Sequence, residues 1–306
     1  MESSFKNNTL ALWVLDQHPE SKLSGVKSGQ ITHASFFDKI YLSGVNSGFI
    51  KKILPDKIIK MPNIEEGVLG KYIGRNIAII DADYIFFLLA GDELLINQNV
   101  IDRIKKIIFD SHNKAAIWGA FEFLDESGSL GTATELHCYQ DGADREIFIT
   151  RGLDKRFDGS ISGAVIPVSA ILQNRHLLEI YDSSTMLPEL LLSLQEIDKI
   201  YQLEPPTVKA YLDTANKRGF QGNAGISFYL YQWITCKQSF LKKRLLRLII
   251  ENIFCTLNIR QIFKTIKICF RICWFYGKKN VLLFPLATIV STVNFVIRRI
   301  NPGWLQ

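Results

Sequence analysis

The sequence predicts an α/β protein with a mostly parallel sheet flanked by helices, followed by a helical, membrane-associated C-terminal tail. Apolar runs of strand length alternate with helical patterns through the first hundred residues. A chain of 306 residues with 47% hydrophobic residues can bury a large core. Residues 237–306 contain 13 Lys and Arg residues and one acid, Glu251, whereas the net charge of the whole chain is only +6. We therefore expect an α/β domain over 1–232 and a basic helical region over 233–306.

Three short strands are expected near the start of the chain. Residues 10–15, LALWVL, form an apolar run that ends at Asp16, as in a buried parallel strand. Residues 38–42 predict the second strand, and the turn-rich loop 43–48 follows it. Residues 57–61 predict the third, which Pro62 and Asn63 close.

A helix, a strand and a second helix are expected next. Residues 66–80 favour a helix, and 83–89, DYIFFLL, give the strongest strand signal in the chain. Residues 99–109 return to helical spacing. Their apolar stripe comprises Val100, Ile101, Ile104, Ile107 and Ile108. Because strands and helices alternate, the strands should run mostly parallel with helices on the faces of the sheet.

The candidate site follows from this arrangement. In open α/β sheets a ligand binds beyond the carboxyl ends of the strands. Asp16, the loop 43–48 and the pair Gly91-Asp92 would all lie at that edge. A carboxylate there can contact a ligand, although a solvated turn acid is the ordinary alternative. Glu93 is expected to be an acid at a helix N-terminus.

Residues 74–94, GRNIAIIDADYIFFLLAGDEL, resemble the signature of the family 2 glycosyltransferases. Arg75 and Asn76 match its "ARNxGI" helix, and 84–94 match the strand and acidic turn that follow. Residues 159–170 resemble the family's acceptor segment, and 188–191, PELL, resemble the region of its catalytic base. The resemblance covers roughly residues 10–215.

This resemblance implies a GT-A fold, a nucleotide-diphosphate sugar donor and a divalent metal, Mg²⁺ or Mn²⁺. It assigns the metal to Asp92, the catalytic base to Glu189, and donor contacts to a further set of residues. These are Asp16, Ser43, Arg75, Asn76 and Gly91. A divalent cation can neutralise the departing diphosphate, and a carboxylate can take the acceptor's proton. The implied reaction transfers a sugar, with inversion, to a lipid-linked or growing cell-surface glycan.

The chain departs from the family pattern at its acids. The turn reads Leu89-Ala90-Gly91-Asp92, where the family has Asp-x-Asp-Asp, and Leu190 stands at the usual position of the base. A second hypothesis therefore stays open, a catalytically degenerate homologue that acts as a binding or scaffold partner. Arg75 could equally hold a phosphate or form a structural ion pair.

The composition of the C-terminal tail indicates that it binds to a membrane surface. Within residues 257–276 helical spacing places Arg260, Lys264, Lys267 and Arg271 along one face, among many Ile, Phe and Trp residues. Such a helix fits an anionic membrane and lacks any nucleic-acid-reading motif, so we expect no nucleic-acid partner. Residues 281–297 are uncharged but short for a span, which favours a re-entrant or interfacial helix. Together with a polar N-terminus, this predicts peripheral or re-entrant association at the cytoplasmic face. The cysteines are expected to be mostly buried thiols.

Overall fold

The computed structural model describes ten stretches of the chain: residues 8–16, 33–44, 55–64, 69–124, 130–132, 141–154, 160–180, 186–211, 223–255 and 259–276. The chain divides into two compact units, Met1–Lys217 and Arg218–Gln306. The boundary predicted between residues 232 and 233 lies within helix α9 (Asn223–Thr235), which belongs wholly to the second unit.

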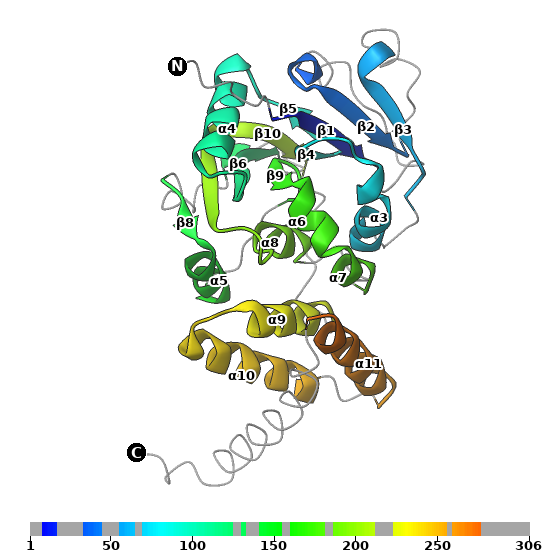
Figure 1. Ribbon diagram of the computed structural model, residues 1–306, viewed down its shortest axis with the longest axis vertical. Coiled ribbons are helices and arrows are strands. Elements are labelled where there is room, and N and C mark those ends of the chain that lie inside the picture. Colours follow the sequence, from blue (N-terminus) through cyan, green and yellow to red (C-terminus); the bar gives the residue numbers. More distant parts are fainter. Residues whose placement is uncertain are drawn as a thin grey trace. The chain divides into compact units, whose positions relative to one another are not determined.

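Four parallel strands form one half of the central sheet (Figure 1), in the order β3-β2-β1-β4. Their bounds are β1 Leu10–Leu15, β2 Lys39–Ser43, β3 Ile58–Met61 and β4 Tyr84–Leu89. The strands predicted from apolar runs are confirmed within one or two residues. Every residue of β1 is buried, as expected for a central parallel strand with both faces covered.

The other half of the sheet is mixed. Strand β9 (Ala164–Pro167) pairs antiparallel with both β4 and β6 (Ala115–Leu124), and so lies between them. Strand β10 (Lys199–Tyr211) pairs parallel with β6 and antiparallel with β5 (Glu93–Leu94). The short strands β7 (Leu130–Thr132) and β8 (Ala143–Asp144) pair antiparallel with β6 and β10. The expectation of a mostly parallel sheet therefore holds for β1 to β4, and the complete sheet is mixed.

Helices cover this sheet. Helix α3 (Leu69–Asn76), continued by a 3₁₀ turn at Ile77–Ile79, occupies the predicted helical region and packs on α7 (Arg175–Ile180). Helices α6 (Val168–Gln173) and α8 (Leu187–Leu192) pack on β9. These four helices lie together below the strands as Figure 1 is drawn. Helix α5 (Arg145–Asp154) follows β8.

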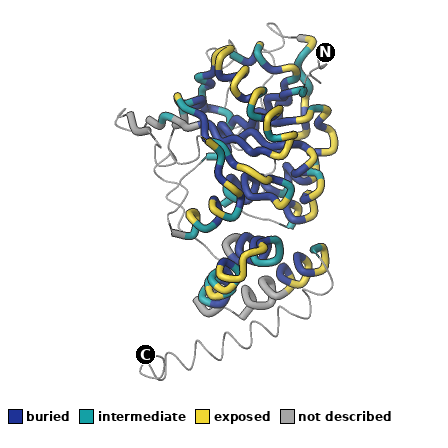
Figure 2. Tube along the Cα trace, turned by 60° about the vertical axis from the view of Figure 1, so that its left-hand side comes forward, coloured by how far each residue is buried: buried dark blue, intermediate teal, exposed yellow. Residues whose placement is uncertain are grey.

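Helix α4 (Gln98–Asp110) matches the second predicted helix. The side chain of Asn97 caps its first turn by accepting the backbone N–H of Val100 at 3.1 Å. Four members of the predicted stripe are buried, and Ile107 is half-buried. Figure 2 shows the buried trace concentrated in the strands. Each fully buried apolar side chain there contributes about 1.5–3 kcal/mol to folding.

The second unit contains helix α9 and two further helices, α10 (Ser239–Cys255) and α11 (Ile259–Phe275), both of which pack on α9. The rings of Tyr231 and Tyr276 meet edge to face, with centroids 5.1 Å apart. Cys236, Cys269 and Cys273 are buried, as predicted for the thiols. No helix within the described part of the chain is long and apolar enough to cross a membrane, and residues 281–297 lie outside that part.

Candidate functional site

The parallel strands β1, β2 and β4 end at one edge of the sheet, which we call the carboxyl edge. Two backbone hydrogen bonds continue the pairing beyond the strands: the Asp16 N–H donates to the Ser43 carbonyl at 2.9 Å, and the Ala90 N–H donates to the Leu15 carbonyl at 2.8 Å. The structure thus brings together Asp16, Ser43 and the Gly91-Asp92 turn, as the sequence predicts.

The ends of β1 and β2 approach each other closely at Gly44. Its φ is +76°, and an added Cβ would lie 2.9 Å from the Asp16 carbonyl oxygen and 3.3 Å from the Asp16 Cβ. A side chain at this position would therefore displace Asp16 and would also strain the backbone. Asp16 itself is only 4% exposed. The absence of a side chain at Gly44 thus lets the end of β2 pack directly against the Asp16 backbone.

Ser43 belongs to a buried chain of hydrogen bonds. The indole N–H of Trp13 donates to the Ser43 hydroxyl at 2.8 Å, and the hydroxyls of Ser43 and Tyr72 are hydrogen-bonded at 2.8 Å. The Tyr72 hydroxyl in turn donates to the Pro62 carbonyl. Burial raises the pKa of Tyr72, and the Ser43 hydrogen bond partly offsets this. Ser43 is fully buried, so its side chain ties β2 to β1 and α3, which favours a structural role.

Asp92 lies in a turn that closes β4. Gly91 adopts φ +101°, and the Asp92 N–H donates to the Leu89 carbonyl at 3.1 Å. The Ser162 hydroxyl makes a short hydrogen bond to the Asp92 carboxylate, and it also accepts the Leu89 N–H at 2.8 Å. Asp92 is 7% exposed and Ser162 is fully buried. The carboxylate is therefore held at the carboxyl edge in one orientation.

Next to Ser162 the backbones of neighbouring strands pack closely around two glycines, Gly163 and Gly119. The Gly163 N–H donates to the Phe87 carbonyl at 2.9 Å, and the Gly163 carbonyl accepts the Gly119 N–H at 2.9 Å. A Cβ on Gly119 would lie 1.7 Å from the Thr207 hydroxyl oxygen. Because these residues have no side chain, strands β4, β9, β6 and β10 can pack closely next to the Asp92 turn. The segment 159–170 was singled out from the sequence, but the bond between Ser162 and Asp92 was not, because no local pattern signals it.

The remaining predicted residues lie on helices. Arg75 is exposed on the last turn of α3, and the Asn76 side-chain amide donates to the Tyr72 carbonyl at 2.9 Å. Glu189 is half-buried in the first turn of α8, directly after Pro188. Glu93 lies in strand β5, opposite Lys209 of β10, so the expectation of an acid at a helix N-terminus is wrong. The turn after β4 continues into an antiparallel strand pair instead.

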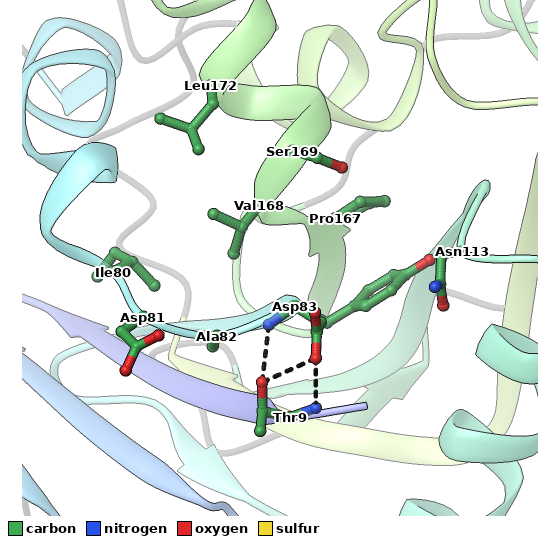
Figure 3. Close-up of a pocket in the computed structure, with 11 residues that line it drawn as sticks. Thr9, Ile80, Asp81, Ala82, Asp83, Asn113, Pro167, Val168, Ser169 and Leu172 are labelled. Carbon is green, nitrogen blue, oxygen red and sulfur yellow. Dashed lines mark hydrogen bonds between the residues drawn. The ribbon is translucent and has the colours of Figure 1, made fainter. Parts of the chain in front are cut away.

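A pocket of about 490 Å³ opens at the other edge of the sheet, where β1 and β4 begin (Figure 3). Asp83 organises it by accepting both the N–H and the hydroxyl of Thr9, at 2.8 and 2.9 Å. The second acid that lines the pocket, Asp81, forms an ion pair with Lys39 at the start of β2. Both carboxylates thus have partners within the protein. Its position, opposite to Asp16 and Asp92, separates it from the predicted site.

Metal-ligating side chains are sparse at the carboxyl edge. Within the described ranges no three His, Cys, Asp or Glu residues come close enough to form a metal centre. Mg²⁺ in nucleotide enzymes commonly takes one or two carboxylates and completes its shell with substrate phosphates and water. A single buried carboxylate at Asp92 fits that shared arrangement, but it does not fit a dedicated protein cage.

The fold, a mixed central sheet flanked by helices, is similar to that of solved structures of S. aureus TarS. One of these structures is S. aureus TarS 1–349 in complex with UDP-GlcNAc, with TM-score 0.52 and 7% identity over 97% of this chain and 93% of that one. A longer S. aureus TarS structure matches with TM-score 0.52 and 8% identity over 93% of this chain and 53% of that one. No protein-family model matches the sequence, and no curated protein matches it significantly.

Proposed function

We propose that this protein is a nucleotide-sugar-dependent glycosyltransferase of the family 2 type. The observation that carries the proposal is the position of two buried carboxylates, Asp16 and Asp92, at the carboxyl edge of a GT-A-like sheet. That edge is where open α/β sheets hold their ligands. The similarity in fold to TarS, whose structure contains UDP-GlcNAc, supports a nucleotide sugar as the donor.

The proposed roles combine the positions of these residues with the family resemblance. Asp16 helps to hold the nucleotide, and Gly91 lets the turn approach the diphosphate without a side chain in the way. Asp92 and the diphosphate are both negative, so a Mg²⁺ or Mn²⁺ shared between them would remove their repulsion and neutralise the leaving group. Arg75 and Asn76 are assigned to the donor by resemblance. Ser43 supports the edge from within the core.

Glu189 is the proposed base. A carboxylate in the first turn of a helix is favoured by the helix dipole in its ionised form, and the ionised form is the one that accepts a proton. In direct displacement it would take the acceptor hydroxyl's proton while that oxygen attacks the anomeric carbon and the nucleoside diphosphate leaves. Glu189→Gln should abolish turnover while leaving donor binding within about threefold of wild type, since a base acts after the donor is bound.

The proposed acceptor is a lipid-linked or growing cell-surface glycan, reached from the cytoplasmic face of the membrane. The 13 cations in residues 237–306 support attachment to anionic lipid at that face. A re-entrant segment over residues 281–297 is part of the same proposal. An acceptor anchored in lipid requires an enzyme held at the membrane, so attachment and acceptor choice belong together.

The second candidate is a catalytically degenerate homologue that binds a partner or a nucleotide sugar without transferring it. The contact between Asp92 and Ser162 favours this alternative, because a buried carboxylate engaged by a hydroxyl can serve structure alone. The same turn has Leu89 where the family has an acid. Donor binding without transfer would support this candidate.

Calorimetry with UDP-, GDP- and dTDP-sugars, each with and without Mn²⁺, tests donor binding directly. Asp92→Asn preserves the shape of the side chain and an acceptor for Ser162 but removes the charge. We expect it to weaken Mn²⁺-dependent donor binding at least tenfold. Asp110→Asn, at an exposed carboxylate on α4, is the matched control and should bind as wild type.

Product mass distinguishes the two candidates. The full-length protein is incubated with each donor and with membrane fractions as acceptor, and the lipid-linked glycans are weighed by mass spectrometry. A donor-dependent gain of one sugar supports the enzyme. If no donor binds under any condition, the glycosyltransferase proposal fails, and binding without any product leaves the degenerate homologue.

A further inference from the structure

Helix α11 presents two different faces over the part whose side chains the structure describes. Its buried stripe packs within the second unit: Ile268, Cys269, Ile272 and Cys273. Its exposed side chains form what we call the α11 face: Lys267, Phe270, Arg271, Trp274 and Phe275. At about 100° per residue these five occupy one continuous arc of about 140°. The exposed residues are therefore contiguous on the helix surface.

The α11 face combines aromatic rings with cations. Phe270, Trp274 and Phe275 are 53%, 60% and 50% exposed. Single exposed apolar residues are ordinary on protein surfaces, but three large rings on one arc of a single helix form a patch. Around the arc the order is Phe270, Trp274, Lys267, Arg271, Phe275, so the two cations lie between the rings. The sequence alone placed the cations and the aromatic residues on different parts of this helix.

An anionic bilayer is the partner that fits both features. Aromatic rings settle at the boundary between headgroups and acyl chains, and neighbouring Lys and Arg side chains reach the lipid phosphates. The one acid of residues 237–306, Glu251, already pairs with Arg247 on α10, at 2.7 Å between Nε and Oε1. Its charge is thus already paired with a cation of its own helix. The positive charge of this region complements an anionic surface.

We propose that the α11 face is the surface by which this protein docks on anionic lipid, with Phe270, Trp274 and Phe275 inserted and Lys267 and Arg271 on the headgroups. The proposed function already includes a membrane partner, and the docking proposal identifies the surface that contacts it. The docking proposal therefore rests on the proposed function. Vesicle binding requires no sugar transfer, however, so the two can fail separately. Donor calorimetry on every variant reports the state of the first unit.

The test is sedimentation of the full-length protein with vesicles of phosphatidylcholine, with and without phosphatidylglycerol. Wild type should bind the anionic vesicles and release from them as salt rises. Lys267→Gln combined with Arg271→Gln should bind about thirtyfold more weakly, since each cation near an anionic surface contributes about fivefold. Wild-type binding that is equal on neutral vesicles would overturn the proposal.

The aromatic residues have a matched control. Phe270→Ala combined with Trp274→Ala should bind anionic vesicles at least tenfold more weakly, because two rings that would insert into the bilayer are removed. Phe109→Ala removes a Phe of the same exposure, 52%, from α4 of the first unit and should leave binding unchanged. Equal binding by wild type and the double variant would contradict the proposal. Thermal unfolding by circular dichroism checks that each variant is folded.

Fluorescence and light scattering complete the test. The test uses a background in which Trp233 and Trp304 are replaced by Phe, so that Trp274 is accompanied only by the buried Trp13 and Trp118. In this background the fluorescence emission should shift to shorter wavelength when anionic vesicles are added, and Trp274→Phe should remove most of that shift. An unchanged shift in Trp274→Phe would place the contact elsewhere. If scattering shows a dimer that the α11-face variants abolish, the occupant is a second copy of the chain and the membrane proposal fails.

Discussion

Ser162 makes a short hydrogen bond to the Asp92 carboxylate and accepts the backbone N–H of Leu89 through the same oxygen. Seventy residues separate the two side chains along the chain. The contact joins the turn after β4 to the segment that leads into β9, and so it sets the direction in which the acid of the carboxyl edge points.

Ser162→Ala removes this connection. The Leu89 N–H and one Asp92 oxygen lose a buried partner, which should lower the free energy of unfolding by about 1–3 kcal/mol. Activity or Mn²⁺-dependent donor affinity should fall about ten- to hundredfold, because Asp92 loses its orientation. Urea denaturation and calorimetry measure the two effects. Ser169→Ala, at an exposed serine on α6, is the control; an equal loss there would remove the special role of Ser162.

Gly44→Ala should be strongly unfavourable. The new Cβ would press on the Asp16 carbonyl oxygen, and φ +76° would cost about 1–2 kcal/mol more for alanine than for glycine. The same exchange at Gly152, in α5, meets nothing within 4 Å and should stabilise the protein by up to about 1 kcal/mol. Thermal unfolding of the two variants compares them directly. Similar melting temperatures would show that the two strand ends are not as close as described.

Thr207→Val should raise stability. The Thr207 hydroxyl oxygen is buried against Gly119 and has no hydrogen-bond partner within the described ranges. Replacing it with a methyl group of similar size removes the cost of a buried unsatisfied group, about 1–3 kcal/mol. Thr207→Ser keeps the hydroxyl, loses the methyl group and should destabilise. Chemical denaturation of the two variants measures their free energies of unfolding. A valine variant less stable than wild type would mean that the Thr207 hydroxyl has a hydrogen-bond partner.

The second unit should weaken at high pH. Burial raises the pKa of Cys269 to about 12 and that of Cys273 to about 11, from an ordinary value of 9.0. The folded state therefore holds its thiol protons more tightly than the unfolded state, so this contribution is complete below pH 9 and is lost as pH rises through about 11. Helicity followed against denaturant at pH 8, 9.5 and 10.5 measures the decline. Cys269→Ala combined with Cys273→Ala should flatten it.

The strands and helices near the N-terminus could be predicted because their signals are local. The run at 10–15 is apolar at every position, and the stripe in α4 repeats at helical spacing, so each pattern reports its own environment. The position of the carboxyl edge could also be predicted, because the carboxyl ends of parallel strands lie on the same side of a sheet. Asp16, Ser43 and Asp92 could therefore be placed together from the sequence.

The insertion of β9 between β4 and β6 could not be predicted in this way. A strand of four apolar residues looks the same whether it runs parallel or antiparallel, and its neighbours in the sheet are distant in sequence. The same holds for Glu93, whose local context suits a helix start as well as the strand pair it forms with β10.

The amino-acid order by itself determined the alternating elements, the acid-bearing edge and the basic tail, since all three depend on composition and spacing within short windows. Only the tertiary structure decided that Ser162 holds Asp92, that Ser43 faces the core, and that Phe270 and Trp274 lie exposed beside Lys267 and Arg271. Those relationships depend on which surfaces pack against each other. Packing is settled by contacts between residues far apart in the chain, which no local pattern encodes.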